Sequence, residues 1–180
     1  TGTPSGRRRR PGIMGDMVDQ APPRPSTIRP ATSVEAGPLA DVERAATLVA
    51  LAHVFPPDRF PYPDADVLAR WRIVLDDPSV TVLVAECDGQ LLGYAAYDDT
   101  WLRHLGVHPD HRGTGLADLL TDAALAGIAA GGATVARLWV VADNHRARRF
   151  YERSGWLRGT ECDTAEFPPH PAEVDYYRPV

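Results

Sequence analysis

The sequence predicts one mixed α+β domain, on three observations. Two β-rich runs are joined by Asp88-Gly89, a pair typical of a tight hairpin turn. A third β-rich run, 101–107, leads through a glycine-rich turn into an apolar helix that is followed by another strand-like segment, 134–141. Finally, 180 residues with 44% hydrophobic content suffice for a single core.

The N-terminal half predicts a short strand and then two helices. Residues 27–32 form a strand, and 38–53 a helix with apolar residues at helical spacing: Leu39, Val42, Ala46, Val49 and Ala50. A second helix is expected over 64–75, with Val67, Trp71 and Val74 on one side. Between them, residues 55–63 contain four prolines and three aromatics, which predicts a stiff, shaped loop.

The middle of the chain predicts the hairpin 80–87 and 90–97, then an irregular strand over 101–107. In this last run the apolar positions change parity between Leu102 and Leu105. A regular pleat would place one of these leucines on the wrong face, so a β-bulge is expected.

The C-terminal half predicts two helices and three strands. The first helix buries one face and stops at Gly131-Gly132; its face consists of Leu116, Leu119, Leu120, Ala123 and Ile128. After strand 134–141, a second helix buries Ala147, Phe150, Tyr151 and Ser154 and ends at Gly155. Strands near 156–162 and 174–178 flank the proline-rich loop 167–171.

Charge is unevenly distributed along the chain. Residues 1–25 carry five arginines and two aspartates and read as an extended tail, leaving 26–180 as the domain. The domain carries fourteen arginines against twenty-two acidic residues, which argues against a nucleic-acid surface and mildly favours a cationic ligand. No segment is long and apolar enough to span a bilayer. Cys87 and Cys162 are expected to be free thiols, which is typical of the reducing cytoplasm, so a cytoplasmic protein is predicted.

The turn at 112–117 is suited to phosphate. Gly113 and Gly115 let backbone amides face a ligand, the helix that follows adds unpaired N-terminal amides, and Arg112 adds positive charge. A dinucleotide fingerprint would need a further Gly or Ala where Asp118 stands, and a P-loop would need a lysine, of which the chain has none.

Two motifs carry a family resemblance. Arg112-x-x-Gly115-x-Ala117 matches the (Q/R)-x-x-G-x-(G/A) pyrophosphate loop of the GNAT N-acetyltransferase superfamily, and residues 144–156 are similar to its second motif, N-x-x-A-x-x-(F/L)-Y-x-x-x-G-(F/W). The resemblance covers about residues 26–180. It implies the GNAT acyl-CoA N-acyltransferase fold, with about four helices and a mostly antiparallel sheet of six to seven strands. Strands four and five would splay apart to admit acetyl-CoA.

The resemblance also implies where acetyl-CoA binds. Backbone amides of Leu105, Gly106 and Val107 would pair with the pantetheine and bind the thioester carbonyl. The pyrophosphate would lie on Arg112, Gly113, Thr114, Gly115, Leu116 and Ala117, and further cofactor contacts would come from Asn144, Ala147 and Tyr151. Capping of the following helix is an equally good role for Asn144.

Tyr151 is expected to be the general acid that protonates the leaving thiolate, because the family places a tyrosine at this motif position. The general base is less determined: His104 is the first candidate, and the alternatives are Glu86, Asp98, Asp99 and His53. No metal site is predicted, since His104, His108 and His111 have no acidic or cysteine partner at ligand spacing.

The expected reaction is direct attack of a primary amine, in a small molecule, on the thioester of acetyl-CoA. Aromatic residues of the first two helices and their loop are expected to line the acceptor site, namely Phe55, Phe60, Tyr62 and Trp71. Two other functions stay open: a CoA-binding sensor without turnover, and acetylation of protein or peptide amines. The same aromatics would also suit a homodimer contact.

Overall fold

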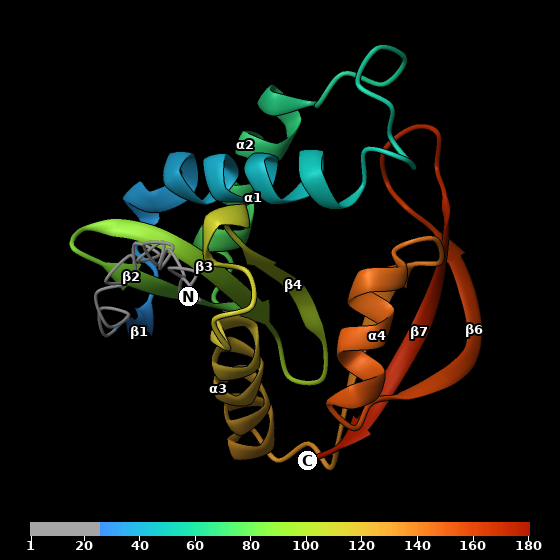
Figure 1. Cartoon of the computed structure of the whole chain (residues 1–180). Helices are drawn as coiled ribbons and strands as arrows, with labels where there is room; N and C mark the ends of the chain where they lie inside the picture. Colours follow the sequence, from blue (N-terminus) through green and yellow to red (C-terminus); the bar gives the residue numbers. More distant parts are fainter. Residues whose placement is uncertain (1–25) are drawn as a thin grey trace, which may run out of the picture.

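A computed structural model describes residues 26–180, which fold into seven strands and four α-helices (Figure 1). The strands form two antiparallel sheets, one of four strands and one of three. The tail predicted for residues 1–25 lies outside the described residues. Within 26–180, no helix is of sufficient length and hydrophobicity to cross a membrane.

The four-stranded sheet has the order β1-β2-β3-β4, with bounds Thr27–Pro30, Thr81–Cys87, Gln90–Tyr97 and Leu102–Val107. The predicted hairpin joins β2 to β3. Asp88 and Gly89 at its turn have φ values of 51° and 78°, which are the positive values that a two-residue turn of this kind requires.

Helices cover both faces of this sheet (Figure 1). α1 (Ala36–Ala50) and α2 (Asp64–Asp76) bury one face, and α3 (Leu116–Ala130) buries the other. The expectation that Leu119 faces the core is wrong: its side chain is 54% exposed. The helix instead buries Leu116, Leu120, Ala124, Leu125 and Ile128, a stripe that leaves position 119 outside.

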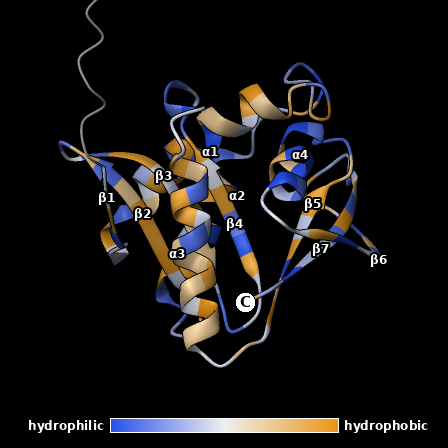
Figure 2. Ribbon diagram, turned by 60° about the horizontal axis from the view of Figure 1, so that its bottom comes forward, coloured by the Kyte–Doolittle hydropathy of each residue, from blue (hydrophilic) through white to orange (hydrophobic). Residues whose placement is uncertain are grey.

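The three-stranded sheet has the order β5-β7-β6, with bounds Val135–Val141, Ala172–Pro179 and Leu157–Thr164. α4 (His145–Arg153) packs on one face of it. Apolar side chains from α3, α4 and both sheets form one continuous core, and Figure 2 shows the apolar strands beside a largely hydrophilic α4. Cys87 and Cys162 are free, in β2 and β6.

The backbones of the two sheets are joined near the start of β4 and β5. A parallel bridge joins Trp101 to Arg137, and the Arg137 amide donates to the Thr100 carbonyl at 2.9 Å. The indole rings of Trp101 and Trp139 stack here, with centroids 5.9 Å apart. Beyond this point β4 and β5 diverge (Figure 2), which confirms the predicted splay of these two strands. Because of this divergence the strands form two sheets, where a single sheet was expected.

The predicted bulge is present in β4. Tyr97 pairs with Leu102 while Ala96 pairs with His104, so Arg103 is the extra residue. The bulge lets Leu102 and Leu105 pack on the α3 side. It also turns His104 to the opposite side, against the Trp71 ring.

Candidate active site

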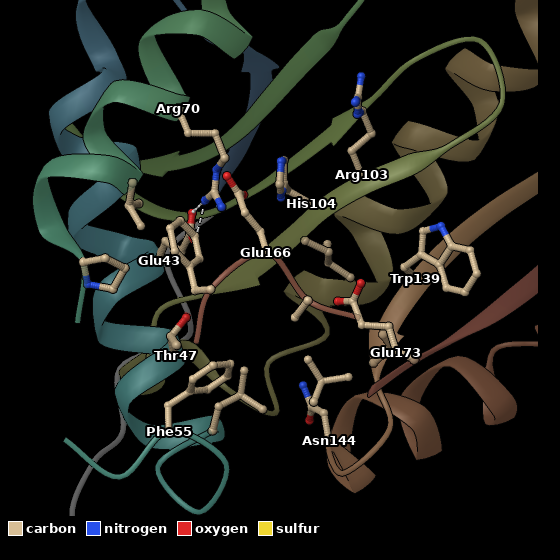
Figure 3. Close-up of a pocket in the computed structure, with 18 of the residues that line it drawn as sticks. Glu43, Thr47, Phe55, Arg70, Arg103, His104, Trp139, Asn144, Glu166 and Glu173 are labelled. Atoms are coloured by element: carbon tan, nitrogen blue, oxygen red, sulfur yellow. Dashed lines mark hydrogen bonds and ion pairs between the residues drawn. The ribbon is translucent and has the colours of Figure 1, made fainter. Parts of the chain in front are cut away.

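A cavity of about 1040 Å³ lies where the two sheets diverge. Its walls come from α1, α2 and the loop between them, from β4 and β5, from the start of α4, and from the β6–β7 loop. Figure 3 shows that polar side chains enter it from several of these elements.

The register of β4 decides which of its amides face the opening. The His108 amide donates to the Leu92 carbonyl of β3, and in an antiparallel pair such bonds recur at every second residue. The amides of Leu105 and Val107 therefore point away from β3, toward β5. The Gly106 amide points toward β3, so it does not serve the role expected of it. Gly106 instead makes room for Tyr94, whose ring would lie 2.5 Å from a Cβ at this position.

The turn before α3 presents unpaired donors. The backbone amides of residues 113–117 find no acceptor within residues 26–180. Gly113 and Gly115 have φ values of 79° and 84°, which glycine adopts without strain. A phosphate group is a natural acceptor for such an array of amides at a helix N-terminus.

Two arginines approach one another near this turn. Arg112 donates through Nη2 to the Ala46 carbonyl of α1 at 3.0 Å. Burial and the nearby positive charge of Arg146, at the start of α4, lower the pKa of Arg112. The sequence motif did not single out Arg146, because its proximity to Arg112 depends on how α4 lies beside the opening.

Tyr151 of α4 lines the cavity and is 8% exposed. Its ring packs against Trp156 and Tyr176, with centroids 5.8 and 6.2 Å away. Burial raises the pKa of the phenol far above neutral pH, so the hydroxyl keeps its proton and can donate it.

Asn144 and Ala147 line the same cavity at the first turn of α4. The Asn144 side chain accepts a hydrogen bond from the Ala147 amide at 3.1 Å, so it caps the helix, which is one of its two expected roles.

His104 lines the cavity but is a weak base in this environment. Its ring lies 5.4 Å from that of Trp71, and burial together with the charges of Arg70 and Arg103 lowers its pKa to about 3. Among the four alternatives, Asp98 alone lines the cavity. Its carboxylate already accepts from the Thr100 and Trp101 amides.

The other three alternative bases do not line the cavity. Glu86 pairs with Arg29 at the far side of the four-stranded sheet. His53 bonds through Nε2 to the Asp143 carbonyl, and Asp99 is exposed on the β3–β4 connection.

Three of the four expected acceptor residues, Phe55, Phe60 and Tyr62, line the cavity. Trp71 does not: it is fully buried, and its indole N–H donates to Glu43 at 2.7 Å. Its helical spacing from Val67 places both side chains in the core, and this explains the difference.

Sequence reasoning missed several charged residues of the cavity. Glu43 of α1 accepts two hydrogen bonds from Arg70 of α2, both at 2.6 Å. Glu173 of β7 and Glu166 of the β6–β7 loop also line it (Figure 3). The alternation of acidic with apolar residues from Glu173 to Tyr176 was an available signal, since it marks a strand with one polar face.

Within residues 26–180 no group of three or more His, Cys, Asp or Glu side chains is arranged to hold a metal ion. His108 and His111 lie together at the turn, with ring centroids 6.2 Å apart. His104 packs on the α2 side of the sheet, as described above.

Known proteins are similar to this chain in sequence and in fold. The chain is 35% identical to an uncharacterized N-acetyltransferase of Archaeoglobus fulgidus, over 48% of this chain and 66% of that protein. It is 38% identical to an uncharacterized N-acetyltransferase of Mycobacterium tuberculosis, over 51% of this chain and 63% of that protein. The matched region thus spans slightly less than two thirds of each relative.

A solved structure with a similar fold is the PaiA N-acetyltransferase of Thermoplasma acidophilum in complex with coenzyme A. The TM-score is 0.67 at 17% identity, with 87% of this chain and 99% of that chain covered. The model of the acetyltransferase (GNAT) family matches residues 46–156, which include the β4–β5 opening, the glycine-rich turn and α4. The chain therefore belongs to the acetyltransferase (GNAT) family.

Proposed function

We propose that this protein transfers an acetyl group from acetyl-CoA to the primary amine of a small molecule. The observation that carries the proposal is the opening between β4 and β5. The unpaired amide of Leu105 lies in this opening beside the cavity, and further unpaired amides lie in the glycine-rich turn between β4 and α3.

The turn suits the pyrophosphate of acetyl-CoA. Five consecutive amides from Gly113 to Ala117 need acceptors, and the positive end of α3 favours an anion. Arg112 and Arg146 repel one another in the free protein, and a bound pyrophosphate would remove that repulsion. The site thus fits a ligand with several negative charges.

The residues along the cavity suit thioester aminolysis. An amide of Leu105 or Val107 would stabilise negative charge on the thioester oxygen as the amine attacks. Tyr151, which is protonated at neutral pH, would give its proton to the departing thiolate. Attack by the amine itself needs no nucleophile from the protein.

The cavity walls favour a small cationic acceptor. Three aromatic rings, those of Phe55, Phe60 and Tyr62, line the cavity and suit an amine through apolar and cation–π contacts. Carboxylates outnumber arginines around the cavity: Glu43, Asp66, Asp77, Asp98, Glu166 and Glu173 against Arg59, Arg70 and Arg103. This charge balance would attract an ammonium group.

The direct test is release of free thiol from acetyl-CoA with a panel of polyamines, amino acids, aryl-alkylamines and short peptides. Acetylated products are identified by mass spectrometry. We expect turnover with a small cationic amine and little with peptides. Preference for peptide N-termini would support the alternative of protein acetylation. CoA binding without turnover on any amine would support a sensor and contradict the proposal.

A further inference from the structure

We propose that Glu173 is the general base that removes a proton from the ammonium group of the acceptor. This inference rests on the proposed acetyl transfer and identifies the group that makes the amine nucleophilic. The bases expected from the sequence are less suited to that role, because the pKa of His104 is lowered, the Asp98 carboxylate accepts from two backbone amides, and the other three do not line the cavity.

The fold places Glu173 at the cavity. It stands near the start of β7, directly opposite Val141 of β5, and the Val141 side chain also lines the cavity. Neighbouring residues of β7 point to the other face, where Val174 and Tyr176 join the core shared with α4. Figure 3 shows the Glu173 carboxylate entering the cavity between Trp139 and Asn144.

The surroundings of Glu173 favour proton uptake. The side chain is half-buried, and no hydrogen bond or ion pair holds its carboxylate within residues 26–180. Burial, and next the negative charge of its cross-strand neighbour Asp163, raise the pKa of Glu173 above the usual range for glutamate. In Figure 3 Trp139 of β5 and Asn144, the N-cap of α4, flank Glu173, and the other labelled titratable groups on this side of the cavity are Glu166, His104 and Arg103.

The remaining carboxylates of the cavity are less suited to this role. Glu43 accepts hydrogen bonds from Arg70 and from the Trp71 indole, so its carboxylate oxygens are already engaged. Asp66 lies on an exposed position of α2, and Asp77 accepts from the Ser79 hydroxyl and amide. Glu166 is exposed on the β6–β7 loop.

The protons balance in the proposed reaction. Glu173 takes one proton from R–NH3⁺ and passes it to solvent. The neutral amine then forms the N–C bond, and the C–S bond breaks. Tyr151 protonates the thiolate and regains a proton from the nitrogen that becomes the amide. The products are the acetamide, CoA thiol and one proton in solution.

The test compares Glu173→Gln with wild type on two acceptors of similar shape. Benzylamine is protonated at neutral pH and needs a base, whereas phenylhydrazine is largely unprotonated and does not. We expect kcat/KM to fall about 100-fold with benzylamine, in the range for loss of a general base, and less than about threefold with phenylhydrazine. A role that is only structural would lower both rates equally.

Matched variants complete the test. Glu161→Gln changes an exposed carboxylate of β6 that does not line the cavity, and we expect it to keep the activity on both acceptors. Glu173→Asp should recover part of the benzylamine rate. Equal losses on both acceptors, or none, in a folded Glu173→Gln protein that binds CoA normally would overturn the assignment of the base alone. Absence of thiol release by wild type with every amine would contradict the proposed function, and this inference with it.

Discussion

At the residue scale, Tyr151 lines the cavity and keeps its proton at neutral pH, as the proposed proton donor must. We expect Tyr151→Phe to lower kcat by roughly 10-fold to 1000-fold, the range for loss of a positioned acid, while the ring packing is kept. Steady-state kinetics under conditions where chemistry limits the rate provide the measurement.

Tyr176→Phe is the matched control for that change. The Tyr176 hydroxyl donates to Glu152 at 2.7 Å and accepts from Arg148 at 3.1 Å, outside the cavity lining. Its loss should reduce stability, by about 1 kcal/mol, and leave turnover nearly unchanged. Equal turnover of wild type and Tyr151→Phe would remove Tyr151 from the reaction.

The sequence predicts the roles of some site residues better than those of others. The cofactor motif could be read directly, because glycines at fixed spacing determine a local turn. The identity of the general base could not be predicted from a local motif, because the pKa of a side chain depends on neighbours from other elements. His104 illustrates this: its pKa is lowered by burial, and next by charges from α2 and β4, which no local pattern reveals.

At the scale of elements, the loop between α1 and α2 presents Tyr62 to the cavity. The Tyr62 hydroxyl is buried and has no hydrogen-bond partner within residues 26–180. We expect Tyr62→Ala to raise the KM of the acceptor by about tenfold and to leave the KM of acetyl-CoA nearly unchanged, because the loop lies away from the glycine-rich turn.

Tyr62→Phe separates the ring from the hydroxyl. A small effect of this variant would assign the contact to the ring, and an effect like that of alanine would assign it to the hydroxyl. If Tyr62→Ala weakens self-association in analytical ultracentrifugation and leaves both KM values unchanged, the loop belongs to an interface between copies.

Elements with a local cause were predicted well. The hairpin at Asp88-Gly89 and the bulge between Leu102 and Leu105 both have the predicted form, since turn residues and side-chain parity act over a few positions. The exposed Leu119 and the buried Trp71 differ from expectation because helix rotation is set by the neighbouring sheet. Division of the strands into two sheets likewise depends on tertiary packing.

At the scale of the whole molecule, an ion cluster links the first strand to the rest of the domain. Arg29 of β1 binds Glu35, 2.7 Å away, and also Glu86 of β2. The hydrogen bond from Arg29 lowers the pKa of Glu35 from 4.5 to about 2. Because the folded-state pKa is depressed, the stabilisation is present above about pH 4.5 and is lost as the pH falls toward 2.

We therefore expect Glu35→Gln to reduce the free energy of unfolding by about 1–2 kcal/mol at pH 7, a value discounted for the partial exposure of Arg29. The difference from wild type should shrink between pH 4.5 and 2. Urea unfolding across this range measures it. Glu161→Gln is the control, because its exposed pairing with Arg137 at 4.0 Å should contribute little. A difference that does not change with pH would contradict this account.

The proposed function depends on binding of the CoA pyrophosphate by the glycine-rich turn at the β4–β5 opening. Gly115 and Gly132 provide a matched pair for testing it. They flank the two ends of α3, have φ values of 84° and 97°, and have open space where a Cβ would lie. Valine costs similar backbone strain at both positions, but only at Gly115 does it disturb the amides of the turn.

Isothermal titration of CoA into wild type, Gly115→Val and Gly132→Val is the most direct measurement. We predict that Gly115→Val weakens CoA binding at least tenfold, about 1.4 kcal/mol, and that Gly132→Val leaves the affinity unchanged. Equal affinities for all three folded proteins would contradict the assignment of this turn as the pyrophosphate site.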